Sequence, residues 1–416
     1  MKIFSVRLTL IFFSTAHLAL AEARTDTDFP LRFDFAGGRG GAGDIAVSPT
    51  NWYSTSTGYG FEPGAMVSVE NQSLTGANPF YFSVKLPEGN YKVRVLLGAA
   101  AGESTTTVKA ELRRLMIEKI RVAPGQTVER EFIVNVRTPA IAGGGEVRLK
   151  SRERESEWWD WDEKLTLEFN GTRPALAGLS IEPADVPTVF LLGDSTVCDQ
   201  PREPWNSWGQ MLPRFFKPAV AVANHAESGE TIKSSLGAHR FDKVFSLLKP
   251  GDYLFLQFGH NDMKDRATNA LAVYKANLQK IVARTREKGA TPVLVTSMER
   301  KNGVEINTLA GYPDAVREVA REEKAALIDL HAMSRKLYRA LGDDLGKAFQ
   351  DGTHHNNFGS YELAKCLAQG IRQARLPLAA LLAGDFPEFD PAHPDPVGAF
   401  QMPASPQASE EKPLGN

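Results

Sequence analysis

The feature that most constrains the fold of this chain is a regular alternation of apolar runs and helical patterns in its second half. Amphipathic helical patterns lie between the apolar runs, most clearly at residues 270–288 and 314–324. The apolar runs, each of strand length, are residues 188–192, 219–223, 253–258, 292–297 and 326–330. Strands that alternate with helices favour a parallel sheet with crossover helices. We therefore predict an α/β domain over residues 186–384.

The first half of the chain predicts an all-β domain over residues 29–170. Its segments alternate β-branched or aromatic residues with others, and turn sequences such as Pro87-Glu88-Gly89-Asn90 separate them. The segments are residues 80–86, 91–97, 104–112, 129–136 and 165–169. Short strands at this spacing are typical of a β-sandwich. Residues 171–185, which contain two prolines, are interpreted as a linker between the two domains.

Both ends of the chain are predicted to lie outside these domains. A positively charged start, with Lys2 and Arg7, precedes an apolar stretch and a small-residue cleavage site at Ala21. We expect residues 1–21 to be a signal peptide and the protein to be secreted or periplasmic; an uncleaved anchor is the alternative. Residues 385–416, rich in proline and poor in large apolar residues, are predicted to be a disordered tail.

Charge and cysteine content narrow the classes of partner. The formal net charge of the 416 residues is −2, so we expect no nucleic-acid partner and no membrane contact after signal cleavage. The oligomeric state stays open. The two cysteines, Cys198 and Cys366, leave two alternatives, a disulfide in an exported chain or two small buried side chains.

A candidate nucleophile stands where the first apolar run of the second half stops abruptly, at Gly193-Asp194-Ser195. In open α/β sheets, ligands bind at the carboxyl ends of the strands. A serine hydroxyl needs an adjacent base held in the right tautomer. Asp351 and His354, three residues apart, can share one turn and act as orienting acid and base. The pattern predicts a serine esterase, and the absence of a G-x-S-x-G sequence argues against the α/β-hydrolase elbow.

The next two predicted strands also end in polar clusters, at residues 224–231 and 259–262. The tetrahedral intermediate of acyl transfer needs hydrogen-bond donors aimed at its oxyanion. A glycine backbone N–H and an asparagine amide, both present in these clusters, can serve as such donors without a metal. We therefore expect no metal and no cofactor.

Together these segments resemble the four sequence blocks of the SGNH (GDSL-type) hydrolases, in the same order and at strand ends. The blocks are Gly193-Asp194-Ser195, Gly229, Gly259-His260-Asn261-Asp262 and Asp351-x-x-His354. The resemblance covers about residues 186–382 and implies a flavodoxin-like, three-layer α/β/α fold. It also implies Ser195 as nucleophile, with Asp351 and His354 completing the triad. The implied oxyanion hole consists of the Ser195 backbone N–H, Gly229 and Asn261.

Within that family the chain resembles the rhamnogalacturonan acetylesterases, through Thr196, Trp208-Gly209-Gln210 and the His355-Asn356 pair after the triad histidine. The implied reaction removes acetyl groups from pectic polysaccharide, so the expected partner is an acetylated polysaccharide or oligosaccharide. Thr196 departs from the leucine of the broader family, and the Asp-x-x-His spacing selects His354 over His355. The first half resembles the galactose-binding-like sandwich modules of some bacterial members.

Several alternatives remain at this point. The same fold is compatible with esters such as acetylxylan, a short-chain lipid or a thioester, and a non-catalytic glycan-binding protein is the rival outside enzymes. The residues Asp351, His354 and His355 are also compatible with a metal site. The aromatic cluster Trp158, Trp159 and Trp161 either stacks on sugar rings or plugs one end of the sandwich.

The remaining polar residues near these blocks are expected to have structural roles. Asp194 is predicted to tie the turn around Ser195. His260 is predicted to brace its own loop, and contact with the substrate is the alternative. We expect His225 and His331 at the surface or the edge of the core, and residues 299–311 as a loop near the substrate pocket.

Overall fold

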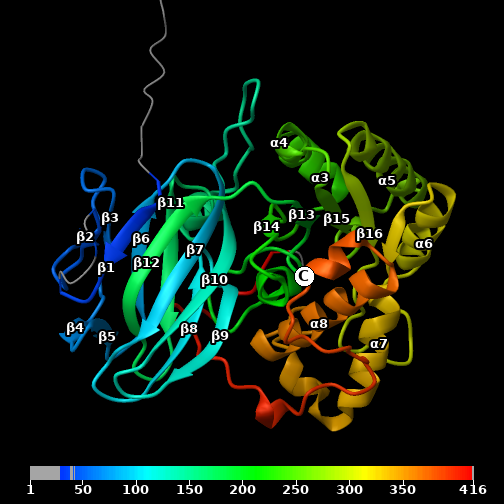
Figure 1. Cartoon of the computed structure of the whole chain (residues 1–416). Coiled ribbons are helices and arrows are strands. Elements are labelled where there is room, and N and C mark those ends of the chain that lie inside the picture. Colours follow the sequence, from blue (N-terminus) through cyan, green and yellow to red (C-terminus); the bar gives the residue numbers. More distant parts are fainter. Residues whose placement is uncertain (1–28, 38–40, 42, 415–416) are drawn as a thin grey trace, which may run out of the picture.

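The fold is described from a computed structural model, which covers residues 29–37, 41 and 43–414. The signal peptide predicted at residues 1–21 lies outside this described part of the chain. Two halves lie side by side, a β-rich half and an α/β half (Figure 1). Within the described residues, no helix combines the length and the apolar character needed to span a membrane.

Two sheets make up the β-rich half and pack face to face. The larger sheet has seven strands and contains the path β10-β7-β12-β1-β2, while the five-stranded sheet has the order β3-β6-β11-β8-β9. The strands of the larger sheet are β1 (Leu31–Asp34), β2 (Ile45–Ala46), β4 (Val67–Glu70), β5 (Ser73–Gly76), β7 (Gly89–Gly98), β10 (Thr127–Val136) and β12 (Ala175–Pro183). Those of the smaller sheet are β3 (Tyr59–Phe61), β6 (Phe80–Lys85), β8 (Ser104–Ala110), β9 (Arg114–Val122) and β11 (Lys164–Asn170).

The two sheets share one apolar core, to which both contribute alternate side chains. Phe33 and Val93 come from the larger sheet, and Phe82 and Leu167 come from the smaller one. Because successive residues of a strand point to opposite faces, this alternation is what buries one face of each sheet. The prediction of an all-β sandwich is confirmed.

The predicted linker at residues 171–185 is wrong, because most of it is strand β12. This strand lies inside the larger sheet, where residues such as Leu179 pair with β1 on one side and with β7 on the other. Its Ala, Gly and Ser content has low strand propensity. The two neighbouring strands supply the hydrogen bonds that make it a strand.

The α/β half is built on a five-stranded parallel sheet with the order β14-β13-β15-β16-β17. Its strands are β13 (Thr188–Gly193), β14 (Ala221–Asn224), β15 (Tyr253–Gln257), β16 (Thr291–Val295) and β17 (Ala326–Ile328). The order corresponds to 2-1-3-4-5, the flavodoxin-like arrangement. The predicted fold class is therefore confirmed, and all five predicted runs contribute strands.

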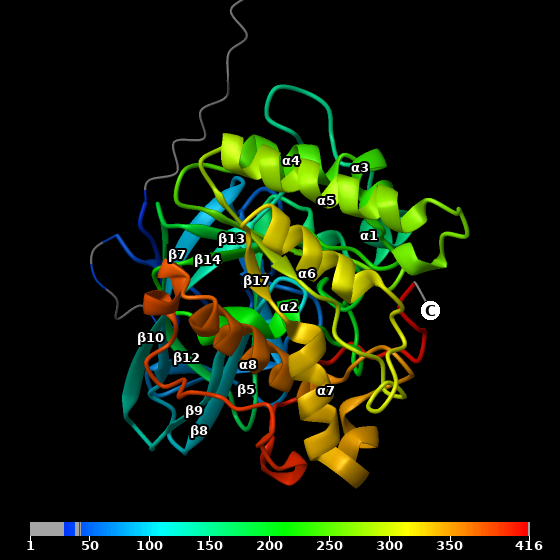
Figure 2. The same ribbon diagram turned by 90° about the vertical axis from the view of Figure 1, so that its right-hand side faces the viewer.

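Helices cover both faces of this sheet and make three layers. Alternate residues of β13 enter two cores: Phe190 packs with α3, α4, α5 and α6, and Leu191 packs with α2, α7 and α8. Figure 2 shows α4 and α5 on one side of the strands and α7 and α8 on the other. The helices are α2 (Trp208–Met211), α3 (Ile232–Gly237), α4 (Arg240–Leu247), α5 (Ala270–Glu287), α6 (Tyr312–Glu322), α7 (Leu330–Leu341) and α8 (Asn357–Gln373).

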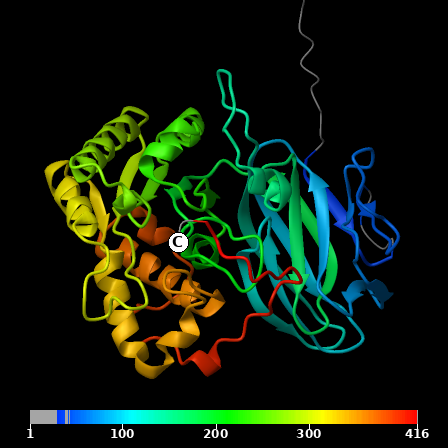
Figure 3. The ribbon, with the colours of Figure 1, turned by 180° about the vertical axis from the view of Figure 1, so that it is seen from behind.

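The predicted disorder of residues 385–416 is wrong for the residues that the structure describes, up to residue 414. Phe386 and Phe389 are buried in the core beneath the sheet. Further on, Lys109 of the sandwich donates hydrogen bonds to the Pro403 carbonyl (2.9 Å) and the Ser405 hydroxyl (2.7 Å). Figure 3 shows this segment, in red, crossing from the α/β half to the sandwich. Backbone hydrogen bonds also hold it: the Glu203 N–H donates to the Gln407 carbonyl and the Ser409 N–H donates to the Glu203 carbonyl, both at 2.8 Å.

Candidate active site

Three side chains predicted from the sequence meet at the carboxyl edge of the parallel sheet. Ser195 follows β13, and its Oγ lies 2.7 Å from Nε2 of His354. Nδ1 of His354 lies 2.9 Å from Oδ2 of Asp351. A hydroxyl, an imidazole and a carboxylate in this order form the arrangement that activates a serine for acyl transfer.

The turn from Asp351 to His354 holds the Asp351 carboxylate in place and keeps it ionised. Oδ1 of Asp351 accepts hydrogen bonds from the backbone N–H groups of Thr353 and His354, both at 2.7 Å. Burial opposes ionisation of Asp351, but the hydrogen bonds from His354 and these N–H groups outweigh it and hold its pKa well below the usual range. The carboxylate therefore stays ionised, and it orients the imidazole through Nδ1.

The turn that presents Ser195 is tied by Asp194, as predicted. Oδ1 of the fully buried Asp194 accepts from the Thr196 backbone N–H (3.0 Å) and from the Thr196 hydroxyl (2.7 Å). Its other oxygen lies 3.4 Å from Nδ1 of His260, whose Nε2 is 2.9 Å from the Met298 carbonyl oxygen. His260 thus braces the loop after β15 against the Ser195 turn and the segment after β16, in agreement with the predicted bracing role.

The loop that follows β14 brings Gly229 to the same edge. The Glu227 backbone N–H donates to the Gly193 carbonyl at 3.2 Å, so this loop lies beside the Ser195 turn. Gly229 has a φ of 76°, a left-handed conformation that glycine adopts without a Cβ clash. Gln200 joins the two segments by donating to the Ser195 carbonyl (2.8 Å) and to the Ser228 hydroxyl (3.3 Å).

Asn261, after β15, is held against the Gly229 loop. Its Nδ2 donates to the Glu230 carbonyl at 3.1 Å, and its Oδ1 accepts from Lys264 at 3.1 Å. An amide nitrogen carries two hydrogens, so Nδ2 keeps a second N–H for another acceptor. The four predicted blocks therefore meet at one edge of the sheet, as strand order 2-1-3 requires.

The neighbouring His355 is not part of this arrangement. Its Nε2 lies 2.9 Å from the Tyr338 hydroxyl, and its ring packs on Phe349 with a 3.9 Å centroid separation. Burial lowers its pKa to about 3, so the ring is neutral. The alternative of a metal site at Asp351, His354 and His355 is not favoured, because both ring nitrogens of His354 already face Asp351 and Ser195.

Within the described part of the chain, one group of acidic side chains is close enough to share an ion. Glu153, Glu157 and Glu227, none of them a triad residue, place carboxylate oxygens within 4.8 Å of one another. Arginines already pair with two of them: Arg152 donates to Glu157 at 2.6 Å and Arg240 donates to Glu153 at 2.5 Å. Burial raises the pKa of the third, Glu227, well above its usual range, so this carboxyl favours its neutral form. We assign no metal to this group.

Several residues at the site carry no local sequence signal that identifies them. The indole of Trp205 meets the His354 ring edge-on, with centroids 5.9 Å apart. Gln257, the last residue of β15, donates to the Thr196 hydroxyl at 2.7 Å and accepts from the Trp208 indole at 2.8 Å. The latter contact gives a structural reason for the Trp208-Gly209-Gln210 motif. The site is enclosed, since Ser195 is only 3% exposed.

The tryptophans at residues 158, 159 and 161 have different environments, so the two interpretations, sugar stacking and structural packing, apply to different members. Trp161 is buried, which agrees with a structural role, but its ring packs against His225 of the α/β half and not inside the sandwich core. Trp158 is 42% exposed and packs beside Trp159, with the Lys164 ammonium 4.5 Å from its ring centre. Stacking on a sugar therefore stays open for Trp158.

Two of the minor expectations need correction. His225 and His331, predicted at the surface or the core edge, are both buried. His331 lies between Glu299 (3.1 Å) and Arg317 (3.1 Å), which explains how its polar ring is accommodated. Cys198 and Cys366 are both free and buried, so the disulfide alternative is not realised.

Comparisons with known proteins identify relatives of this chain. Residues 191–360 match the GDSL-like Lipase/Acylhydrolase family. The chain is 38% identical over 212 residues to rhamnogalacturonan acetylesterase RhgT of Bacillus subtilis (strain 168), an alignment that covers 46% of this chain and 91% of that protein. It is also 33% identical over 207 residues to YesY, a probable rhamnogalacturonan acetylesterase of the same strain, over 46% of this chain and 94% of YesY.

A further alignment spans both halves of the chain. The uncharacterised esterase YxiM of Bacillus subtilis (strain 168) is 27% identical over 399 residues, covering 89% of this chain and 97% of YxiM. The crystal structure of YxiM superimposes with a TM-score of 0.47 at 24% identity, over 84% of this chain and 99% of that one.

Proposed function

The chain belongs to the GDSL-like lipase/acylhydrolase family, and on that premise we propose that it is an exported serine esterase that removes O-acetyl groups from pectic rhamnogalacturonan. The enzyme class, a carboxylic-ester hydrolase acting on carbohydrate acetyl groups, follows from its acetylesterase relatives. The proposed substrate, rhamnogalacturonan, extends the activity named for RhgT to this chain.

The observation that carries the proposal is the hydrogen-bond chain from Asp351 through His354 to Ser195. In this mechanism His354 Nε2 accepts the hydroxyl proton while Ser195 Oγ attacks the acetyl carbonyl carbon. The tetrahedral intermediate then collapses, and His354 gives the proton to the departing sugar oxygen. Asp351 stabilises the imidazolium that exists between these two transfers.

A second half-reaction regenerates the enzyme. Water attacks the acetyl-Ser195 carbonyl as His354 takes one of its protons, and acetate leaves as that proton returns to Ser195 Oγ. The oxyanion of both intermediates is stabilised by the Ser195 and Gly229 backbone N–H groups and the Asn261 amide. Every step uses groups of the protein and water.

Ser195→Ala tests this function. Acetate release should fall by about 10⁴-fold or more, because the nucleophile is lost. The substrates are acetylated rhamnogalacturonan fragments, acetylated xylan and short-chain p-nitrophenyl esters, and the first should give the highest kcat/KM. Ser246→Ala, on helix α4, serves as a control with unchanged activity. Near-normal deacetylation by Ser195→Ala would contradict the triad assignment. Binding of fragments by the unmodified protein without acetate release would favour a non-catalytic glycan-binding protein.

Export is tested separately. The protein recovered from the culture medium or periplasm should begin after Ala21. A cell-associated protein that retains residues 1–21 would instead support the uncleaved anchor.

A further inference from the structure

One lysine of the β-rich half reaches across to the loop that holds Gly229. Lys150 directly precedes α1 (Ser151–Glu155), and its side chain is 29% exposed. Its Nζ donates a hydrogen bond to the Ser228 carbonyl oxygen at 2.5 Å. The same Nζ forms an ion pair with Oε1 of Glu230 at 2.6 Å. Lys150 therefore contacts the residue on each side of Gly229.

The Ser228 carbonyl and the Gly229 N–H belong to the same peptide unit. A trans peptide is planar, and its C=O and N–H point in opposite directions. Holding the oxygen end of this unit therefore also sets the direction of the Gly229 N–H. A hydrogen bond from an ammonium group is charge-assisted and polarises the peptide, which makes the N–H at the other end a stronger donor.

This restraint matters because Gly229 lacks a Cβ. Glycine enters left-handed conformations easily, so the peptide before Gly229 can rotate at low cost unless something holds it. The Ser228 side chain is buried and contacts Cys198 (3.3 Å), which fixes one part of the loop. Lys150 holds the peptide oxygen itself.

The second partner of Lys150 leads to another oxyanion donor. The Glu230 carbonyl accepts the hydrogen bond from Asn261 Nδ2 at 3.1 Å. Burial opposes ionisation of the Glu230 carboxyl, but Lys150 and Arg240 outweigh it and keep its pKa below the usual value. Glu230 is therefore ionised and holds the Lys150 ammonium in place beside the Ser228–Gly229 peptide. The backbone carbonyl of the same residue orients Asn261.

We propose that Lys150 is a positioning residue for the oxyanion hole: it orients and polarises the Ser228–Gly229 peptide, so the sandwich half takes part in acyl transfer without touching the substrate. This inference rests on the proposed esterase function.

The segment that carries Lys150 is itself anchored to the α/β half, so the position of the lysine relative to the Gly229 loop is fixed. Its backbone N–H donates to Oε2 of Glu153 at 2.8 Å, and the same oxygen accepts from Arg240 of helix α4 at 2.5 Å. Two residues earlier, the Arg148 backbone N–H donates to the Ala238 carbonyl at 3.0 Å. The Arg148 guanidinium reaches the Gly237 carbonyl (3.3 Å), away from the oxyanion loop. Arg148 is therefore a matched control.

The test compares Lys150→Met, Lys150→Arg and Arg148→Met in the full chain. Loss of one oxyanion donor costs about 10²–10³ in kcat, so weakening one through Lys150→Met should lower kcat by about 10- to 100-fold. KM should change by no more than about twofold if Lys150 acts through the Ser228–Gly229 peptide and not on the substrate, and a KM effect that exceeds the kcat effect would contradict this role. Lys150→Arg should recover most of the loss, and Arg148→Met should match the unmodified protein.

A second readout separates positioning from a folding defect. In Lys150→Ala, added n-propylammonium should restore part of the kcat in a saturable manner, which requires a folded site with room for the cation. Lys150→Met that keeps kcat within about twofold of the unmodified protein would overturn the proposal. So would a loss of kcat that neither the guanidinium of the Lys150→Arg variant nor n-propylammonium restores.

Failure of this inference can be told apart from failure of the proposed function. Labelling of Ser195 by a p-nitrophenyl phosphonate requires the oxyanion donors but no sugar. If the unmodified protein releases no acetate, the esterase proposal fails, while the labelling rates of the Lys150 and Arg148 variants still decide the role of Lys150. Equal labelling rates in all variants contradict that role.

Discussion

At the scale of single residues, two carboxyl groups beside the site have opposite environments. Asp351 receives hydrogen bonds from His354 and from backbone N–H groups, which keep its pKa low. Asp262 accepts a hydrogen bond from the Ile232 N–H at 3.0 Å, but burial outweighs it and raises the pKa of this carboxyl to about 7. Asp351 is therefore suited to orient a cationic imidazole, whereas Asp262 is protonated over much of the acidic range.

The raised pKa of Asp262 predicts a pH-dependent stability. Below the unfolded pKa of about 4, both states hold the proton and the group has no effect. As the pH rises from 4 to 7, the unfolded chain loses this proton first, so the group lowers the free energy of unfolding by up to about 4 kcal/mol. Asp262→Asn should therefore gain stability relative to the unmodified protein across this window, as measured by urea unfolding at several pH values.

The control for this prediction is a substitution of a side chain that does not titrate. Ser246→Ala, which removes the hydroxyl that donates to the Lys243 carbonyl, should change the stability by the same amount at every pH. A flat difference for Asp262→Asn as well would contradict the buried, protonated carboxyl.

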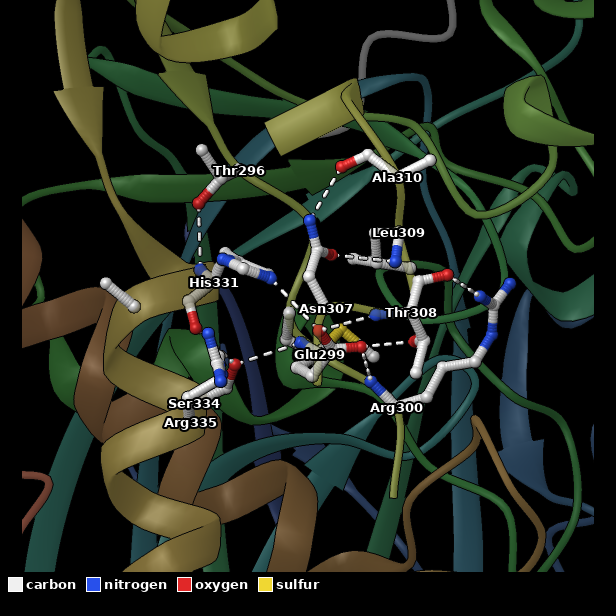
Figure 4. A network of polar contacts seen from close by, with 12 residues as sticks. Thr296, Glu299, Arg300, Asn307, Thr308, Leu309, Ala310, His331, Ser334 and Arg335 are labelled. Carbon is white, nitrogen blue, oxygen red and sulfur yellow. Dashed lines mark hydrogen bonds and ion pairs between the residues drawn. The ribbon is translucent and has the colours of Figure 1, made fainter. Parts of the chain in front are cut away.

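At the scale of elements, the predicted loop at residues 299–311 is ordered around one buried carboxylate (Figure 4). The Glu299 carboxylate accepts from the backbone N–H groups of Arg300 (2.8 Å) and Thr308 (3.1 Å) and lies 3.1 Å from His331 Nε2. Its own N–H meets Ser334 Oγ at 2.9 Å, which docks the loop on helix α7. The Glu299 side chain thus connects the two ends of the loop, near residues 300 and 308, to His331 of helix α7.

Replacing this carboxylate should loosen the whole loop. Glu299→Gln turns an amide N–H₂ towards groups that are themselves donors, and hydrogen bonds to a charged acceptor contribute about 1.5–3 kcal/mol each. We expect a loss of about 3 kcal/mol in the free energy of unfolding and faster proteolytic cleavage within residues 299–311. Denaturant unfolding and limited proteolysis measure these effects.

The matched control lies on the same loop. Glu305, 75% exposed at its side chain, pairs with Arg339 at 3.2 Å, and such surface pairs contribute at most about 1 kcal/mol. Glu305→Gln should therefore be close to neutral. Equal cleavage rates for the two variants would show that Glu299 does not organise the loop.

At the scale of the whole molecule, a buried ionic network joins the two halves. Arg114 of β9 donates to Asp199, four residues after Ser195, at 2.7 Å and to Asp160 at 2.8 Å. Arg137 donates to the other oxygen of Asp160 at 2.8 Å. These side chains are almost completely buried, so they are paired charges in a low-dielectric interface. The sandwich and the catalytic half therefore form one structural unit.

Breaking this network should destabilise both halves together. Arg114→Met leaves Asp160 and Asp199 partly uncompensated, which typically costs about 3–5 kcal/mol. We expect a lower denaturant midpoint and a parallel loss of acetate release, because Asp199 adjoins the Ser195 turn. Arg121→Met, on the same strand but in an exposed pair with Glu103, should leave the denaturant midpoint close to that of the unmodified protein. Equal stabilities of the two variants would contradict a shared unit.

The triad and the fold of the second half were predictable because their signals are local. The run from residue 188 to Ser195 shows a buried strand that ends in a polar turn, and Asp351 and His354 are close along the chain. Parallel strands present their carboxyl ends at one edge, so the polar clusters at residues 224–231 and 259–262 follow from position, whereas the choice of Gly229 and Asn261 within them came from the family resemblance. The choice of His354 over His355 also depended only on spacing within one turn.

What the sequence alone could not decide depends on partners distant along the chain. Residues 175–183 become a strand only between β7 and β1, and the proline-rich segment after residue 385 is ordered by Lys109 and by core pockets for its phenylalanines. Lys150 acquires a role only because folding places it 2.5 Å from the Ser228 carbonyl. Local patterns determined the strands, the helices and the chemical groups of the site. Tertiary structure decided which distant segments hold those groups in place, because such contacts depend on the packing of the whole chain.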